Sequence, residues 1–242
     1  MQAPSSDGGT DYERYMRTEI LLSLQRRPED VIHRDELLFQ TVHQCTELLL
    51  KLGCAEVNEG TRLLKEDKAD AAARLLGRAS ECVTCATDNL GLLRHLNPSD
   101  FQIIRTVLGN GSGLQSPGWR TVREVSADLR SAFEQHIAKT CANISQLYRN
   151  GVDTPLYRLA EAMIEWDERI SIWRVRHFKL AVRIIGEQGV GTRGMPVDGL
   201  RKLIDHKFFP DLWAVRDELG QMGATQAEAC VSGNSARAGQ DR

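Results

Sequence analysis

Residues 154–186 have the sequence TPLYRLAEAMIEWDERISIWRVRHFKLAVRIIG, and this stretch decides the fold class. Its large apolar side chains recur every three, four or seven positions, which is the spacing of one face of an α-helix. Thr154 followed by Pro155 is typical of a helix N-terminus, and Gly186 of a helix end. We therefore predict one long helix over 155–185 with its apolar face in a hydrophobic core. That face consists of Leu159, Trp166, Ile170, Trp173, Leu180 and Ile184.

Helical spacing continues on both sides of this stretch, and no segment alternates apolar and polar residues as a strand does. Two glycine-rich loops, 109–118 and 189–194, separate the helical segments. We predict an all-α fold with one helical domain over 11–220, between termini, 1–10 and 221–242, whose composition predicts disorder. Further helices are expected over 12–24, 35–52, about 68–96, a segment opened by Asn97-Pro98, 119–148, and short segments near 200 and over 208–219.

The composition excludes several classes of protein. Lys and Arg number 31 against 33 Asp and Glu, so the net charge of −2 gives no basic surface for nucleic acid. No apolar run reaches the ~18 residues of a membrane span, and the N-terminus lacks a secretory signal. The six cysteines include one CxxC pair, Cys82 and Cys85, without the further ligands that zinc requires. We predict a cytoplasmic protein with reduced thiols and neither a nucleic-acid nor a membrane partner.

His177 lies on the apolar stripe of the 155–185 helix. One interpretation is a core histidine whose ring nitrogens bind neighbouring groups. The other is an imidazole directed into an apolar cavity, as ligation of haem iron requires. Arg174 and Arg176 flank it and would either meet haem propionates or face solvent.

The second predicted helix carries a matching pair. Phe39 and His43 are four residues apart and so share one helical face. They are either core residues or the wall of a site for a flat, apolar ligand that carries one N–H group.

Arg105 interrupts the apolar pattern of FQIIRTVLG, residues 101–109. An arginine there either extends to water or pairs with a carboxylate, which its planar donors match. The loop that follows contains Ser112 and Gly113, and it is either a plain connection or a source of donors close to a ligand. The later GVGTRG loop, 189–194, lacks the preceding strand and the Lys-Ser/Thr pair of a phosphate-binding loop.

These segments, in this order, resemble the haem-dependent tryptophan 2,3-dioxygenase family across nearly the whole chain. The most specific blocks are F-x-x-x-H-Q-x-x-E-L from Phe39 and R-x(6)-S-G-x-Q-S from Arg105. The other matching stretches are YxxYMRTEILLSLQ from Tyr12, WRVRH from Trp173 and FFPDLWAVR from Phe208.

The resemblance implies a role for each matching residue. His177 would be the axial ligand of haem b, and His43 and Ser112 would be catalytic, near the indole N–H and the bound O2. Phe39, Arg105 and Thr192 would contact the substrate indole, carboxylate and ammonium. An N-terminal helix that enters a neighbouring subunit's site would supply Tyr12, Tyr15, Met16 and Ile20. The cofactor pocket would be lined by Gly113, Trp119, Arg120 and Trp173.

The implied protein is a helical bundle enclosing a b-type haem, of the tryptophan/indoleamine dioxygenase kind, assembled as a homotetramer. With O2 as co-substrate it would oxygenate the indole of L-tryptophan or a close derivative across C2–C3, giving N-formylkynurenine. A related haem-dependent branch in secondary metabolism instead adds one oxygen to tryptophan or β-methyltryptophan, giving a 2-oxindole. The chain departs from the family at Arg193, which replaces a glycine in the loop G-T-R-G-M from Gly191. Two alternative functions remain for this chain: a haem-based sensor or carrier without turnover, and a helical scaffold that has lost haem.

Overall fold

The computed structural model describes residues 9–109, 111–192 and 194–222. The predicted disordered termini fall almost entirely outside these ranges, as does Arg193. Within them the chain is all-α, as predicted: no strand is formed, and the only sheet-like pairing is an isolated antiparallel bridge between Val190 and Pro196. No helix in the described ranges is long and apolar enough to cross a membrane.

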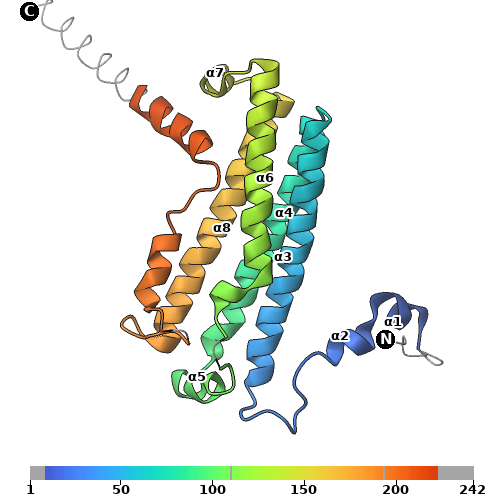
Figure 1. Cartoon of the computed structure of the whole chain (residues 1–242), viewed down its shortest axis with the longest axis vertical. Coiled ribbons are helices and arrows are strands. Elements are labelled where there is room, and N and C mark those ends of the chain that lie inside the picture. Colours follow the sequence, from blue (N-terminus) through green and yellow to red (C-terminus); the bar gives the residue numbers. More distant parts are fainter. Residues whose placement is uncertain (1–8, 110, 193, 223–242) are drawn as a thin grey trace, which may run out of the picture.

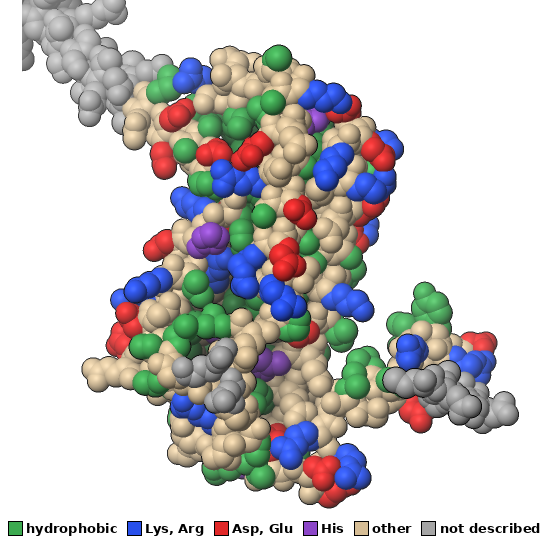
Figure 2. Space-filling view, in the orientation of Figure 1, with side chains coloured by type: hydrophobic (Ala, Val, Ile, Leu, Met, Phe, Trp, Pro, Cys, Tyr) green, Lys and Arg blue, Asp and Glu red, His purple; other side chains and the backbone are tan. Residues whose placement is uncertain are grey.

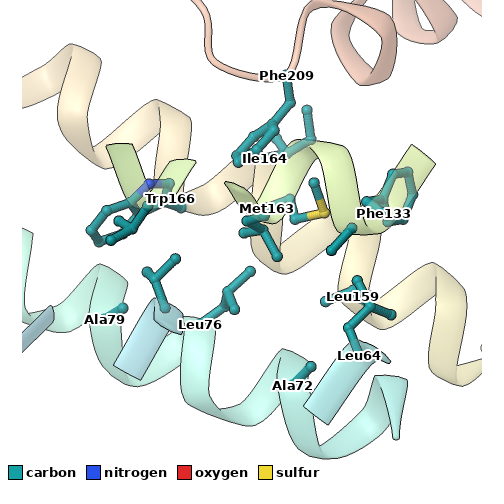
Figure 3. Packing of buried hydrophobic residues seen from close by; sticks show 14 of the residues in the cluster. Leu64, Ala72, Leu76, Ala79, Phe133, Leu159, Met163, Ile164, Trp166 and Phe209 are labelled. Carbon is teal, nitrogen blue, oxygen red and sulfur yellow. The ribbon is translucent and has the colours of Figure 1, made fainter. Parts of the chain in front are cut away.

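Four long helices, α3 (Glu36–Lys65), α4 (Ala69–Asn89), α6 (Pro117–Thr140) and α8 (Pro155–Ile185), run side by side as a bundle (Figure 1). Helix α8 has the predicted bounds because the Thr154 side chain accepts the Tyr157 N–H at its start and Gly186 ends it at φ 99°. The predicted apolar stripe supplies the core. Figure 3 shows Met163 and Trp166 of α8 packed among side chains of the neighbouring helices.

Two predicted helices are interrupted in the structure. The expected 12–24 helix is two short ones, α1 (Asp11–Met16) and α2 (Thr18–Leu22), because Arg17 adopts a left-handed conformation between them. The expected 119–148 helix ends at Cys141, also left-handed, before α7 (Ile144–Arg149) begins. Neither short helix of the first pair buries a residue, so packing does not hold that segment straight.

One end of the bundle has its own hydrophobic cluster. There η1 (Leu90–His95) and α5 (Pro98–Arg105) turn across the bundle, and Asn97 caps α5 through its side chain, as the Asn97-Pro98 pair predicts. Loop 109–118 includes η2 (Gly113–Gln115), and η3 (Val197–Leu203) follows the second glycine-rich loop. The cluster contains Val42, Leu90, Leu93, Leu96, Phe101, Ile104 and Ile184. Trp173 packs against both this cluster and the main core, so it joins the two.

A buried carboxylate ties the C-terminal segment to α8. Asp167, 2% exposed, accepts hydrogen bonds from the backbone N–H groups of Phe208 and Phe209 at 2.8 and 3.2 Å. The indole N–H of Trp213 donates to the same oxygen at 3.1 Å. Residues 210–222 are helical, in agreement with the predicted short helix there.

The N-terminal arm, residues 11–22, stands away from the bundle (Figure 1). The linker that follows it is held along α3 by Glu36, Gln40 and Gln44, which share one helical face. Most large apolar side chains of the arm are exposed, Tyr15 at 87% and Leu22 at 74%, and Ile20 is half-buried. Figure 2 shows hydrophobic side chains beside charged ones on the arm, and positive and negative side chains intermingled over the bundle face in view.

Candidate functional site

The fold brings His43 of α3 and His177 of α8 into electrostatic range of one another at the α5 end of the bundle. Desolvation, reinforced by His43, lowers the pKa of His177 to about 4. Solvent reaches His43, yet the surrounding protein desolvates its ring and lowers its pKa. Both imidazoles are therefore neutral near pH 7, the form in which histidine binds metals.

The hydrogen bond of His43 fixes the direction of its ring. Nδ1 lies 2.7 Å from the carbonyl oxygen of Phe39, which can only accept, so Nδ1 carries the proton. In the neutral ring Nε2 is then an acceptor for an N–H group. The Phe39 ring lies 4.1 Å from the His43 ring between centroids, as their spacing of one helical turn predicts. Together they offer an aromatic surface beside a single acceptor.

His177 forms one end of an aromatic stack. The Trp173 ring, one turn earlier on α8, lies 4.8 Å from the His177 ring with only 9° between their planes. Trp119 of α6 packs against Trp173, with the centroids of the two indole rings 4.0 Å apart. The indole Nε1 of Trp173 is buried and has no hydrogen-bond partner within the described ranges. The site thus has flat apolar walls and one unpaired N–H donor.

Arg105 makes a contact that neither interpretation from the sequence anticipated. It is half-buried, and its Nη2 donates to the carbonyl oxygen of Val190 at 2.6 Å instead of pairing with an acidic side chain of the described ranges. Val190 belongs to the second glycine-rich loop, and Thr192 of the same loop makes a further contact, because its hydroxyl donates to the carbonyl oxygen of Gly111. The two glycine-rich loops therefore meet beside Arg105.

The remaining cofactor-pocket candidates lie around loop 109–118. Ser112 caps η2 through its side chain and is half-buried, and Gly113 next to it is exposed. Trp119 belongs to the aromatic group described above. Arg120 is exposed, with its Nε 3.9 Å from Glu124, so the structure does not bring its guanidinium into the aromatic group.

The N-terminal candidates are separate from this chain's own site. Tyr12, Tyr15, Met16 and Ile20 all lie on α1 and α2, which stand away from the bundle (Figure 1).

Glu47 is a site residue to which the sequence analysis gave no role. It lies one turn after His43 on α3, and its carboxylate accepts hydrogen bonds from the Ser116 hydroxyl and from the Gly118 N–H. The available signal was the pattern itself. Glu47 is the acidic position of F-x-x-x-H-Q-x-x-E-L, and Ser116 is the last residue of R-x(6)-S-G-x-Q-S.

Comparisons with known proteins point to one family. The family model described as tryptophan 2,3-dioxygenase matches residues 2–132. The tryptophan 2,3-dioxygenase of Bacillus thuringiensis subsp. konkukian is 30% identical over 260 positions, covering 86% of this chain and 92% of that protein. The enzymes of the same name from Myxococcus xanthus and Serratia proteamaculans are each 28% identical, covering 88% and 86% of this chain and 90% and 93% of their own.

Proposed function

The chain belongs to the tryptophan 2,3-dioxygenase family of oxidoreductases, and from this membership we propose that it uses haem b and O2 to oxygenate the indole ring of L-tryptophan or a close derivative across C2–C3, giving N-formylkynurenine. The observation that carries the proposal is that His43 and His177, from distant parts of the chain, each pack against an aromatic ring and lie close enough for His43 to lower the pKa of His177.

The residues present fit a planar, largely apolar cofactor with a metal at its centre. His177 has the neutral imidazole that iron requires, and the unpaired Nε1 of buried Trp173 shows a donor without a protein partner in the described ranges. His177 would hold the iron, and Trp173, Trp119, Gly113 and Arg120 would lie around the cofactor. Bound haem supplies the redox chemistry by which O2 becomes reactive toward an indole.

Substrate recognition falls to side chains of α3, α5 and the two loops. We assign the carboxylate to Arg105, whose guanidinium keeps four further N–H donors beside the one bonded to Val190. The indole would pack on Phe39 and donate its N–H to Nε2 of His43, which the bond to the Phe39 carbonyl leaves as an acceptor. Thr192 would contact the ammonium, and Ser112 would lie near O2.

The N-terminal arm would complete a neighbouring subunit's site in a homotetramer. The proposal draws on the exposure of the apolar side chains of the arm, 65% for Tyr12 and 50% for Met16, and on the linker that holds the arm away from its own bundle. Tyr12, Tyr15, Met16 and Ile20 would then meet substrate from the partner's side.

A second outcome is addition of a single oxygen atom to give a 2-oxindole. The observation that favours it is in the sequence: Arg193, a long charged residue, stands where the family has glycine, directly after Thr192.

The proposed function is tested by loading the full chain with haem, reducing it, and adding L-tryptophan in air. We expect a Soret band and consumption of one O2 for each tryptophan lost. A haem protein that consumes no O2 with tryptophan or with β-methyltryptophan would be a sensor or carrier, and a chain that binds no haem would be a scaffold. Either result contradicts the proposal.

A further inference from the structure

Glu47 joins the two most specific blocks of the sequence in space. It is half-buried on α3, and its Oε2 accepts the Gly118 N–H at 2.8 Å while its other oxygen accepts the Ser116 hydroxyl. Gly118 lies in the first turn of α6, where N–H groups have no partner inside the helix. A carboxylate at a helix N-terminus is stabilised both by these donors and by the helix dipole. The contact therefore fixes where α6 begins relative to α3.

The start of α6 carries the tryptophan that faces the His177 stack. Ser116 caps the helix by accepting the Trp119 N–H at 3.1 Å, so the residue held by Glu47 also holds the backbone of Trp119. From there the Trp119 ring reaches Trp173, which stacks on His177. An unbroken series of contacts thus runs from Glu47 to the imidazole on α8.

The packing around this contact leaves little room for movement. A Cβ atom at Gly118 would lie 2.7 Å from Oε2 of Glu47 and 2.9 Å from Cδ1 of Leu50. Both distances are shorter than carbon atoms tolerate, so glycine is what allows the two helices to approach this closely. Such close packing is expected where the position of a helix end has to be reproduced accurately.

We infer that Glu47 is a positioning residue of the candidate site: by holding Ser116 and Gly118 it keeps Trp119 against Trp173 and so sets the aromatic surroundings of His177. Its effect on haem rests on the proposed function, whereas its effect on the tryptophan pair does not. Groups that orient a metal ligand from outside the ligand set typically change metal affinity by about ten- to a hundredfold.

The test uses the full chain, with and without haem, and a matched control. Two indoles with centroids 4.0 Å apart are close enough to give an exciton couplet in the far-ultraviolet circular dichroism spectrum, and Trp119→Phe identifies that couplet. Glu47→Ala removes both acceptors, and Glu47→Gln keeps an acceptor for Gly118. The control is Glu56→Ala, because Glu56 is also a partly buried glutamate of α3 that binds another helix, through Arg78 at 3.0 Å.

We expect Glu47→Ala to lose most of the couplet and to release haem to an apo-globin acceptor about tenfold faster than the parent does. Glu47→Gln should restore most of the couplet and most of the parental haem retention. Glu56→Ala should match the parent in both measurements. If Glu47→Ala does not fold, Ser116→Ala, which removes the hydroxyl that joins Glu47 to the Trp119 N–H, must still weaken the couplet. A parental couplet in Glu47→Ala, or in Ser116→Ala where the first variant is insoluble, overturns the inference. The two proposals can fail separately. If Glu47→Ala loses the couplet that the parent shows, but the parent never binds haem, the positioning role is supported and the proposed function is contradicted.

Discussion

Arg105 of α5 and Val190, 85 residues further along the chain, are joined by a hydrogen bond of 2.6 Å from the guanidinium Nη2 to the backbone carbonyl oxygen. The arginine that we assign to the substrate carboxylate is thus also a contact of the loop beside the site. If Arg105 binds the carboxylate as assigned, substrate binding and the position of Val190 would be coupled through this one side chain.

Replacing Arg105 with leucine should weaken tryptophan binding by roughly 2–5 kcal/mol, because the substrate carboxylate loses its charged partner in a partly desolvated site. Spectral titration of the haem-loaded variant with L-tryptophan measures this. Tryptamine, which has no carboxylate, serves as the control ligand and should bind both proteins alike. A tryptophan Kd within about twofold of the parent rules out the assignment.

Replacing His177 with alanine should abolish tight haem binding, since the imidazole that we assign as the axial ligand is gone. The absorption spectrum of the purified variant, recorded without added imidazole, provides the measurement. His95→Ala is the matched control, because His95 is an exposed histidine at the same end of the bundle. A parental ferrous Soret spectrum in His177→Ala would show that another residue binds the iron.

Acidification should destabilise the haem-free chain between about pH 6.5 and pH 4. The pKa of His177 falls from 6.5 to about 4 on folding, so in this window the unfolded chain binds the proton that the folded chain excludes, and stability falls as pH falls. The full effect is about 3 kcal/mol.

Urea unfolding of the parent and of His177→Leu at both ends of the window isolates this contribution, because the other titrating groups are common to the two proteins. His95→Gln should keep the parental pH dependence. Equal pH dependence in the parent and in His177→Leu would contradict the buried, neutral state of this imidazole.

Deleting the residues before Thr18 should leave the bundle intact, because α1 buries no side chain. It should nevertheless lower kcat/KM strongly if Tyr12 and Tyr15 complete a neighbour's site. Thermal unfolding and steady-state kinetics of the truncated chain separate the two effects, and light scattering reports its assembly. Unchanged kcat/KM at an unchanged Tm would refute the exchanged arm.

Much of the fold follows from local chemistry in the sequence. The bounds of α8 were predicted correctly because a capping threonine and a terminal glycine mark its two ends and a continuous apolar stripe lies between them. The breaks at Arg17 and Cys141 were not predicted, because both residues adopt a left-handed conformation that neither residue type favours. The pairing of Phe39 with His43 followed from helical spacing alone.

The contacts of the candidate site that join distant segments were not predictable in the same way. Arg105 binds a backbone carbonyl, and a carbonyl has no signature in the sequence. Glu47 lies in a recognised pattern, but its role depends on Ser116 and Gly118, whose positions are set by how α6 packs against α3. The sequence offered candidate residues, whereas the structure was required to say what each one contacts.

Ring-opening dioxygenation is tested by mass spectrometry of the product formed from L-tryptophan by the haem-loaded, reduced full chain under isotopically labelled O2. We expect a product that has gained two oxygen atoms, both labelled, as N-formylkynurenine requires. A predominant product that has gained a single labelled oxygen atom would contradict ring-opening dioxygenation and establish the 2-oxindole outcome in its place.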